Sequence, residues 1–421
     1  MDDARSCFFT IFASVNRPMH FETGACILVG QSEAFRLRKR VLFMPWKATI
    51  LLSVFFGGLL ASCSKQRSLP ADLAPYENLF DEQSIAEDFV NLKVTPFGRH
   101  DLSFEMLVPK DWKEVQLKVP REMLLKPYSN FVPLCRVVAE GEEGTPKIEV
   151  QVLKLPLELG LTDFVINYLE GNHLRPLLRR PGRFNGRRVE DVVVSTSSEG
   201  RTYMARMTFS MHGDKLFVVV GSCEKGSYGA WARHFGLAAV SFRPRKPAPP
   251  FIEKMATYVY PGTPYLEFRH PVSWKVVQPE HLPEGMSGTD LVLQVKDKVF
   301  GYIHVKAVKS QLGIDAYEAL SRLKKDFEDS GILVGKLLRE SELVKGQRSP
   351  AFRIQVWQAF HSDQVGELAT LIMSDGNTIY ALGLLVPPRN QNLLAWMTSW
   401  RVFEIVYGDI IEQMERKGWR P

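Results

Sequence analysis

The residues of this sequence that could ligate a metal or attack a substrate are scattered along the chain. Its nine histidines include no H-E-x-x-H pair, and its five cysteines include no C-x-x-C pair. Ser222 and Cys223 follow a glycine, but the spacing of a nucleophile elbow is missing and no base can be named. His212 and His304 fall by a turn and in a strand-like run, and we interpret both as surface or core residues. The sequence therefore predicts no catalytic residue, no metal, no cofactor and a protein that is not an enzyme.

One concentration of positive charge stands out between an expected helix and an expected strand. It could bind lipid headgroups or an acidic partner, and the alternative is a solvated loop. The net charge of +6 is too diffuse to indicate nucleic acid, which we do not expect as a partner. The candidate anionic-partner patch consists of Arg175, Arg179, Arg180, Arg183, Arg187 and Arg188.

An apolar run over residues 48–60 follows Lys47 and a basic cluster that ends at Arg40. A basic region, an apolar core of about 7–15 residues and small residues before a cleavage point are typical of a secretory signal. A membrane-spanning helix needs about 20 apolar residues, so this run is too short to span. The sequence therefore predicts a signal peptide over residues 44–62.

The run ends in Leu60-Ala61-Ser62-Cys63, which resembles the lipobox of bacterial lipoproteins. The resemblance implies cleavage between Ser62 and Cys63, a diacylglycerol thioether on Cys63 and acylation of the new amine. Several acyl chains anchor strongly, at about 0.8 kcal/mol per buried methylene. Ser64 follows in place of an aspartate, which in the enterobacterial pattern implies the outer membrane, with the protein facing the periplasm. The alternative is a plain signal peptide or signal anchor with an incidental cysteine.

The segment before the signal does not fit a precursor that begins at residue 1. Signal peptides start close to the amino terminus, and Met44 directly precedes the sequence PWKATILL. We therefore expect translation to begin at Met44 or a few residues upstream, and residues 1–43 to be a misassigned or disordered extension. After the cleavage point, residues 63–95 are polar and punctuated by prolines, which predicts a flexible tether.

Cys135 and Cys223 both fall in the first half of the exported chain. An oxidising envelope permits a disulfide between them, which would stabilise the fold by about 4 kcal/mol in the chain-entropy model. Two buried thiols are the alternative, because free cysteine packs as a small hydrophobic residue.

Two blocks of similar length flank a proline-dense linker over residues 244–256, and a tail follows over residues 409–421. The blocks, 96–243 and 257–408, share landmarks in one order, which indicates an internal repeat. Pro109 and Trp112 in the first block match Pro271 and Trp274 in the second, and we expect the tryptophans to be core residues. A strand-like run, a capped helix, glycine-turn hairpins and a closing aromatic helix around Trp231 or Trp396 follow in both.

This order resembles the PsbP-like fold, which includes thylakoid-lumen PsbP proteins and bacterial envelope lipoproteins such as the DcrB group. The resemblance covers roughly residues 102–244 and 258–406, and the usual single copy is here doubled. It implies an α+β fold of two tandem antiparallel-sheet domains flanked by helices, an α/β/α sandwich in each case. It also implies an accessory or adaptor role, because family members mostly act in that way.

Taken together, these features predict a lipid-anchored, non-catalytic envelope protein that docks onto a larger assembly, such as secretion or transport machinery. A first alternative is a periplasmic lipoprotein that binds a small ligand, a lipid or a cell-wall fragment, which predicts a cavity with a few convergent polar groups. A second alternative is an enzyme of unrecognised type.

Overall fold

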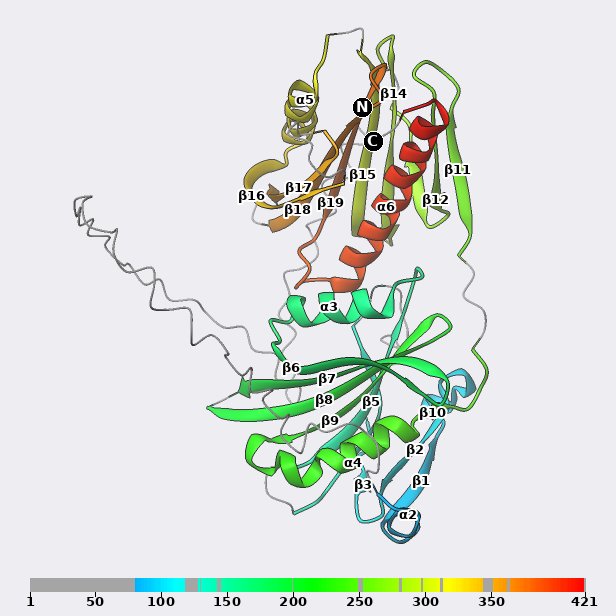
Figure 1. Ribbon diagram of the computed structural model, residues 1–421, viewed down its shortest axis with the longest axis vertical. Helices are drawn as coiled ribbons and strands as arrows, with labels where there is room; N and C mark the ends of the chain where they lie inside the picture. The colour runs from blue at the N-terminus through cyan, green and yellow to red at the C-terminus, as the bar shows by residue number, and fades with distance from the viewer. Residues whose placement is uncertain are drawn as a thin grey trace, which may run out of the picture.

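The computed structural model describes residues 80–117, 128, 130–141, 145–198, 200–248, 253–279, 282–296, 298–310, 313–343, 351–361 and 364–419. Within these residues the chain forms two domains, each built on a seven-stranded antiparallel sheet with helices on its faces (Figure 1). This is the tandem α+β architecture that the sequence predicts. The extension, the signal peptide, Ser62, Cys63 and the first part of the expected tether lie outside the described residues.

In the first sheet the strands are ordered β3-β4-β5-β9-β8-β7-β6. Helix α3 (Leu161–Gly171) packs on β7 and β8 on one face, and α4 (Tyr228–Ser241) packs on the other face. A short helix, α2 (Glu82–Asp88), leads into a hairpin that lies against α4, and this hairpin consists of β1 (Phe89–Val94) and β2 (Phe104–Pro109), with β10 (Arg243–Pro244) at its edge. The sheet strands are β3 (Lys113–Glu114), β4 (Val132–Val138), β5 (Lys147–Lys154), β6 (Pro176–Phe184), β7 (Arg187–Ser198), β8 (Arg201–His212) and β9 (Lys215–Glu224).

The second sheet repeats this order strand for strand, as β13-β14-β15-β19-β18-β17-β16. Helix α5 (Ala316–Asp329) packs on β18 and β19, and α6 (Leu393–Arg416) packs on the opposite face and on a separate hairpin. That hairpin consists of β11 (Met255–Tyr260) and β12 (Leu266–Pro271). The sheet strands are β13 (Trp274–Val277), β14 (Met286–Val295), β15 (Lys298–Lys309), β16 (Leu333–Glu342), β17 (Arg353–His361), β18 (Gln364–Ser374) and β19 (Thr378–Val386).

The burial of individual strands explains the layered arrangement. Every residue of the central strand β19 is buried, as its continuous apolar run TIYALGLLV predicts for a strand covered on both faces. The edge strand β16 is mostly exposed. Trp112 is 6% exposed and Trp274 is 2% exposed, which confirms both as core residues at the start of each sheet.

Three predicted boundaries are wrong where the structure describes them. The expected tether reaches residue 95, but α2 and β1 already belong to the first domain, because β1 pairs with β2 along its whole length. The expected linker overlaps β10 and the start of β11. The expected tail from residue 409 is the last part of α6, where Asp409 accepts hydrogen bonds from the backbone and guanidinium of Arg269.

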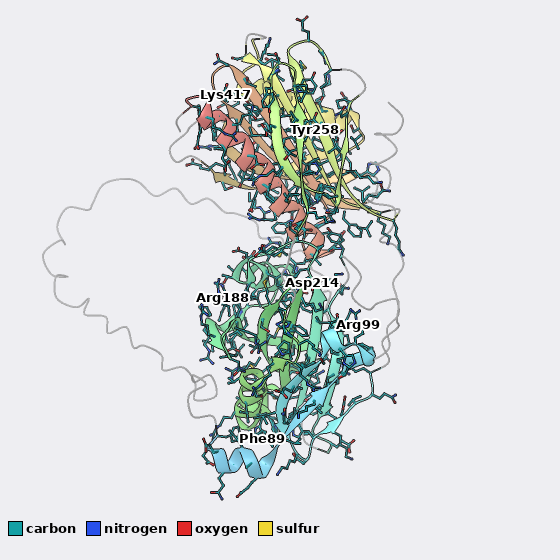
Figure 2. The ribbon with its side chains drawn as sticks, turned by 90° about the vertical axis from the view of Figure 1, so that its right-hand side faces the viewer. Phe89, Arg99, Arg188, Asp214, Tyr258 and Lys417 are labelled. Carbon is teal, nitrogen blue, oxygen red and sulfur yellow. The ribbon has the colours of Figure 1, made fainter. Side chains whose placement is uncertain are left out.

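The two domains meet where α3 of the first contacts α6 of the second (Figure 1). One continuous apolar cluster runs from under α3, with Phe164 and Leu169, into the core beneath α6, with Leu394 and Met397. Figure 2 shows Arg188 and Asp214 at the end of the first domain that faces the second, and Phe89 at the far end. The junction is thus part of the packed core as well as a chain connection.

Candidate functional site

A groove of about 1310 Å³ lies between the two domains. The first domain contributes the loop before α3, the start of α3 and the β6–β7 turn, and the second contributes the end of β16, β17 and one side of α6. Half of the lining residues are apolar, and the charged ones include both signs. The lining includes Leu157, Leu159, Met211, Met255, Ile354, Met397, Trp396, Trp400, Arg188, Arg339, Arg401, Glu158, Asp163, Glu253 and Glu404.

Tryptophans and arginines alternate along the wall that belongs to the second domain. The guanidinium of Arg339 lies 5.3 Å from the ring centre of Trp396 and 5.4 Å from that of Trp400. The guanidinium of Arg389 lies 4.9 Å from the Trp396 ring. Glu367 accepts hydrogen bonds from the Trp396 indole at 2.9 Å and from Arg339 at 3.4 Å. These stacked pairs hold the arginine side chains in place, since each contact contributes about 0.5–1 kcal/mol at such sites.

Arg389 also joins the wall to the first domain. It forms an ion pair with Glu170 and donates a hydrogen bond of 3.0 Å to Asn167, both on α3. A Cβ on Gly171, at the end of α3, would lie 3.3 Å from the Arg389 side chain, so the close approach favours glycine there. The junction therefore has a specific polar contact beside its apolar one.

Two carboxylates, Glu158 and Glu253, face the groove from the first domain and from the segment between the domains. Burial, reinforced by the negative charge of Glu158, raises the pKa of Glu253 to about 7. This carboxyl group thus changes its charge near neutral pH.

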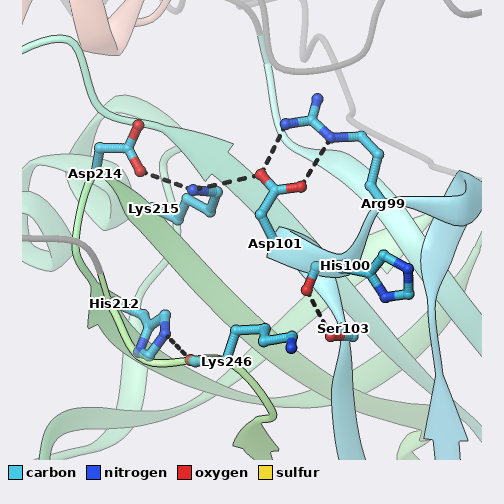
Figure 3. Close-up of polar contacts among 8 residues, drawn as sticks. All are labelled: Arg99, His100, Asp101, Ser103, His212, Asp214, Lys215 and Lys246. Carbon is cyan, nitrogen blue, oxygen red and sulfur yellow. Dashed lines mark hydrogen bonds and ion pairs between the residues drawn. The ribbon is translucent and has the colours of Figure 1, made fainter.

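A second set of polar contacts lies beside the segment in which the chain leaves the first domain (Figure 3). Lys215 is buried, and its Nζ lies 2.8 Å from Asp214 and 3.6 Å from Asp101. His212 donates a hydrogen bond of 2.8 Å to the backbone oxygen of Lys246. Burial lowers the pKa of His212, and the hydrogen bond to Lys246 opposes this shift. These contacts are structural: His212 holds the backbone at Lys246 near the β8–β9 turn, and Lys215 ties this turn to Asp101.

The six arginines of the predicted patch do not form one surface. They lie on the hairpin of β6 and β7 and just before it, and successive side chains of a strand point to opposite faces. Arg179 pairs with Glu190 at 3.2 Å on the α3 face, and Arg180 pairs with Asp191 at 3.1 Å on the α4 face. The alternative of a solvated loop is also wrong, because this segment is paired strand.

Arg187 is half-buried and contacts the core of the first domain. Its guanidinium donates to the backbone oxygen of Phe242 and lies 5.3 Å from the ring of the same residue. Burial lowers the pKa of Arg187. Arg175, Arg183 and Arg188 are exposed, and of these three Arg188 lines the groove.

Of the two alternatives for Cys135 and Cys223, the structure has two buried thiols and no disulfide between them. Cys135 is on β4 and Cys223 is on β9, with β5 between them. Two strand spacings of about 4.8 Å each therefore separate their backbones, and this exceeds the ~7 Å between Cα atoms that a disulfide allows. Burial is the main cause that raises the pKa of each thiol to about 12.

The remaining sequence predictions concern histidines, ligands and the anchor. His304 hydrogen-bonds through Nδ1 to Asp290 at 2.7 Å on the sheet face under α5, which agrees with its interpretation as a residue that packs within the fold. Over the described residues, no group of three or more histidine, cysteine or acidic side chains could hold a metal ion. In the same part of the chain, none of the helices has both the length and the apolar character needed to cross a bilayer. The roles of Ser62 and Cys63 stay predictions.

Sequence reasoning missed the residues that define the groove. The pair Trp396 and Trp400, four residues apart, indicated an aromatic helix, but their partner Arg339 lies on a strand nearly sixty residues away. Only the arrangement of the two domains brings these residues beside Glu158 and Glu253, and no local pattern carries that information.

No family model matches the chain, and a search of curated proteins finds no match. Among solved structures, it is similar to the PsbP protein CyanoP of Synechocystis, at 14% identity and a TM-score of 0.28, covering 37% of this chain and 92% of that chain. It is similar to LpqN of Mycobacterium tuberculosis, described as involved in cell envelope biogenesis, at 9% identity and a TM-score of 0.26. This match covers 38% of this chain and 92% of LpqN. It is also similar to the Ran-binding protein Mog1p of Saccharomyces cerevisiae, at 14% identity and a TM-score of 0.24. This match covers 37% of this chain and 96% of Mog1p. Each match spans about one domain of this chain, and the description of the fold rests on the strands and helices themselves.

Proposed function

We propose that this chain is a non-catalytic, lipid-anchored protein of the bacterial cell envelope that binds a protein of a larger assembly through the groove between its domains. The observation that carries the proposal is the groove itself, a hollow of about 1310 Å³ lined by apolar and charged side chains from both domains. Concave sites that combine apolar area with a few polar groups are typical of binding sites.

The size of the groove favours a macromolecular partner over a small ligand. Pockets for small molecules usually have volumes of about 300–1,000 Å³ and bury most of the ligand. The groove is larger than this, at about 1310 Å³, and its lining extends over elements of both domains. A segment of a protein would fill more of it than a small ligand would.

The anchor in this proposal comes from the lipobox at Leu60-Ala61-Ser62-Cys63. Acyl chains on Cys63 would hold the protein at the membrane, with the outer membrane favoured by Ser64, and would leave both domains in the periplasm. A partner that also belongs to the envelope would then be met at high effective concentration.

The test is a crosslinked pull-down from native membranes with the wild type, Cys63→Ala and, as a matched control, Ser64→Ala. We expect the wild type and Ser64→Ala to recover the same envelope protein and Cys63→Ala to recover less of it. Recovery of no envelope protein by any form would contradict the adaptor role. Equal recovery by Cys63→Ala would contradict the role of the lipid anchor.

A further inference from the structure

Arg339 is a cation of the groove wall that is held in place but incompletely paired. Its side chain is 41% exposed, and Glu367 is its hydrogen-bond partner within the described residues, at 3.4 Å. Glu367 also accepts a hydrogen bond from the indole N–H of Trp396, at the shorter distance of 2.9 Å. The rings of Trp396 and Trp400 fix the guanidinium plane, so the donors that Glu367 does not use are already oriented.

The charge around Arg339 is complementary to an added carboxylate. Burial lowers the pKa of Arg339, and the positive charge of Arg389 lowers it further, while Glu367 opposes this shift. Two other cations of this wall already have carboxylate partners, since Arg401 pairs with Glu404 on the same helix at 3.2 Å and Arg389 pairs with Glu170. An acidic group placed at Arg339 would therefore meet a preorganised fork of donors, for which Glu367 competes through one hydrogen bond of 3.4 Å.

The position of Arg339 on β16 indicates an extended occupant. Strand β16 ends the second sheet, and within the described residues β17 is its one neighbouring strand. An edge strand leaves backbone N–H and C=O groups for another strand to pair with. The equivalent edge strand of the first domain, β6, contains Pro176 and Pro181, which remove such donors, whereas β16 contains no proline.

The mixed charge of the groove argues against a membrane surface as its occupant. Glu158, Asp163 and Glu253 line the groove together with Arg187 and Arg188, so the lining is not the uniformly positive surface that anionic headgroups favour. A bilayer is also too flat to enter a groove between two domains. A peptide segment can match such a mixed lining, because it can place an acidic side chain at Arg339 and basic ones beside the carboxylates.

Building on the proposed function, we infer that the groove binds an extended segment of the partner protein and that Arg339 receives an acidic side chain of this segment. The apolar side chains of the segment would pack on Ile354, Met397 and Trp400. Arg339 is then the residue that determines specificity for a negatively charged segment.

The experiment measures the binding of fluorescent synthetic peptides to the full chain in detergent. The probes are short peptides of alternating leucine and glutamate, and matched peptides with glutamine or lysine in place of glutamate. The proteins are the wild type, Arg339→Ala, Arg339→Lys and the control Arg322→Ala. Arg322 is a good match because it is 51% exposed and pairs with a glutamate, Glu318, but lies on α5 across the sheet.

We expect the wild type and Arg322→Ala to bind the glutamate peptide at least about tenfold more tightly than the other two peptides. Arg339→Ala should lose this preference, and Arg339→Lys should keep part of it, because lysine is charged but lacks the planar fork. Circular dichroism of each variant checks that the fold is intact.

Equal affinity for all three peptides, or an Arg339→Ala variant that keeps the preference, would overturn the inference. Binding to phosphatidylglycerol vesicles and to none of the peptides would also overturn it, because Arg339 would then bind a lipid headgroup. Failure here is distinct from failure of the proposed function. A partner that is recovered equally by wild type and Arg339→Ala in the crosslinked pull-down would refute the acidic segment and leave the adaptor role standing.

Discussion

Arg389 of the second domain donates a hydrogen bond of 3.0 Å to the side-chain oxygen of Asn167 on α3 of the first domain. The same guanidinium pairs with Glu170 and stacks on Trp396, which in turn stacks with Arg339 in the groove. One side chain therefore contacts both the neighbouring domain and the wall of the candidate binding site. The orientation of the domains and the shape of the groove are consequently linked through Arg389.

Replacing Arg389 with alanine should widen the distribution of distances between the domains and leave each domain folded. The lost contacts are few and partly exposed, so we expect a cost of about 1 kcal/mol or less at the junction. Distances between spin labels placed one in each domain would measure the change. Arg201→Ala, which breaks a pair with Glu224 inside the first domain, is the control, and equal distributions for both variants would refute the link.

Asp191 should be the most sensitive carboxylate of the first domain. It is fully buried and accepts hydrogen bonds from Arg180, Arg206 and Thr208. Asp191→Ala leaves buried positive charge without its partner, which costs about 3–5 kcal/mol. Urea unfolding of the first domain within the full chain measures this loss, and Glu140→Ala, at an exposed ion pair with Lys113, should cost about 0–1 kcal/mol. Similar losses for the two variants would contradict the buried network.

A methyl group at Gly221 should destabilise the first domain by overpacking. A Cβ at this position on β9 would overlap the side chain of Phe235 on α4, and such insertions cost about 1–3 kcal/mol. Gly229 on α4 has nothing within 4 Å of the added atom, so Gly229→Ala should be neutral or stabilising by up to about 1 kcal/mol. Thermal denaturation of both variants provides the test, and an unchanged midpoint for Gly221→Ala would mean that α4 lies farther from the sheet.

The stability of the junction should fall as the pH rises towards neutrality. The pKa of Glu253 is raised from 4.5 to about 7 in the folded chain, so the folded state binds the proton more tightly than the unfolded state. Its contribution to stability is full below about pH 4.5 and is lost as the pH rises through about 7. Glu253→Gln should remove this part of the pH dependence, and Glu404→Gln serves as the control. Parallel stability curves for the wild type and Glu253→Gln would contradict the assignment.

Much of the fold could be predicted from the sequence because the two domains repeat the same local signals. Pro109 with Trp112 and Pro271 with Trp274 mark equivalent positions of the two domains, between the first hairpin and the large sheet. Both tryptophans are in the core. The predicted end of the tether at residue 95 is wrong, because the segment is polar and contains prolines and so gives no local signal for the strand FVNLKV. This strand is stabilised by pairing with β2, which lies farther along the chain. Tertiary pairing of this kind outweighs local composition.

The candidate site was far less predictable than the fold. The sequence marks Arg187 and Arg188 by their charge alone, whereas the structure shows that both line the groove and that Arg187 is held against Phe242. Cys135 and Cys223 are too far apart for a bond because strand order inserts β5 between them. Strand order and the contact of two domains depend on the whole chain, so short motifs do not reveal them.

The most direct test of the central claim is site-specific photocrosslinking in intact membranes. A photoreactive amino acid at Ser341, which lines the groove on β16, is compared with one at Tyr317, which is 65% exposed on α5. The account predicts that the Ser341 position captures one envelope protein, that Arg339→Ala reduces this capture, and that the Tyr317 position does not capture the same protein. Capture of that protein equally from both positions, or of no envelope protein from Ser341, would contradict the claim that the groove is the binding site.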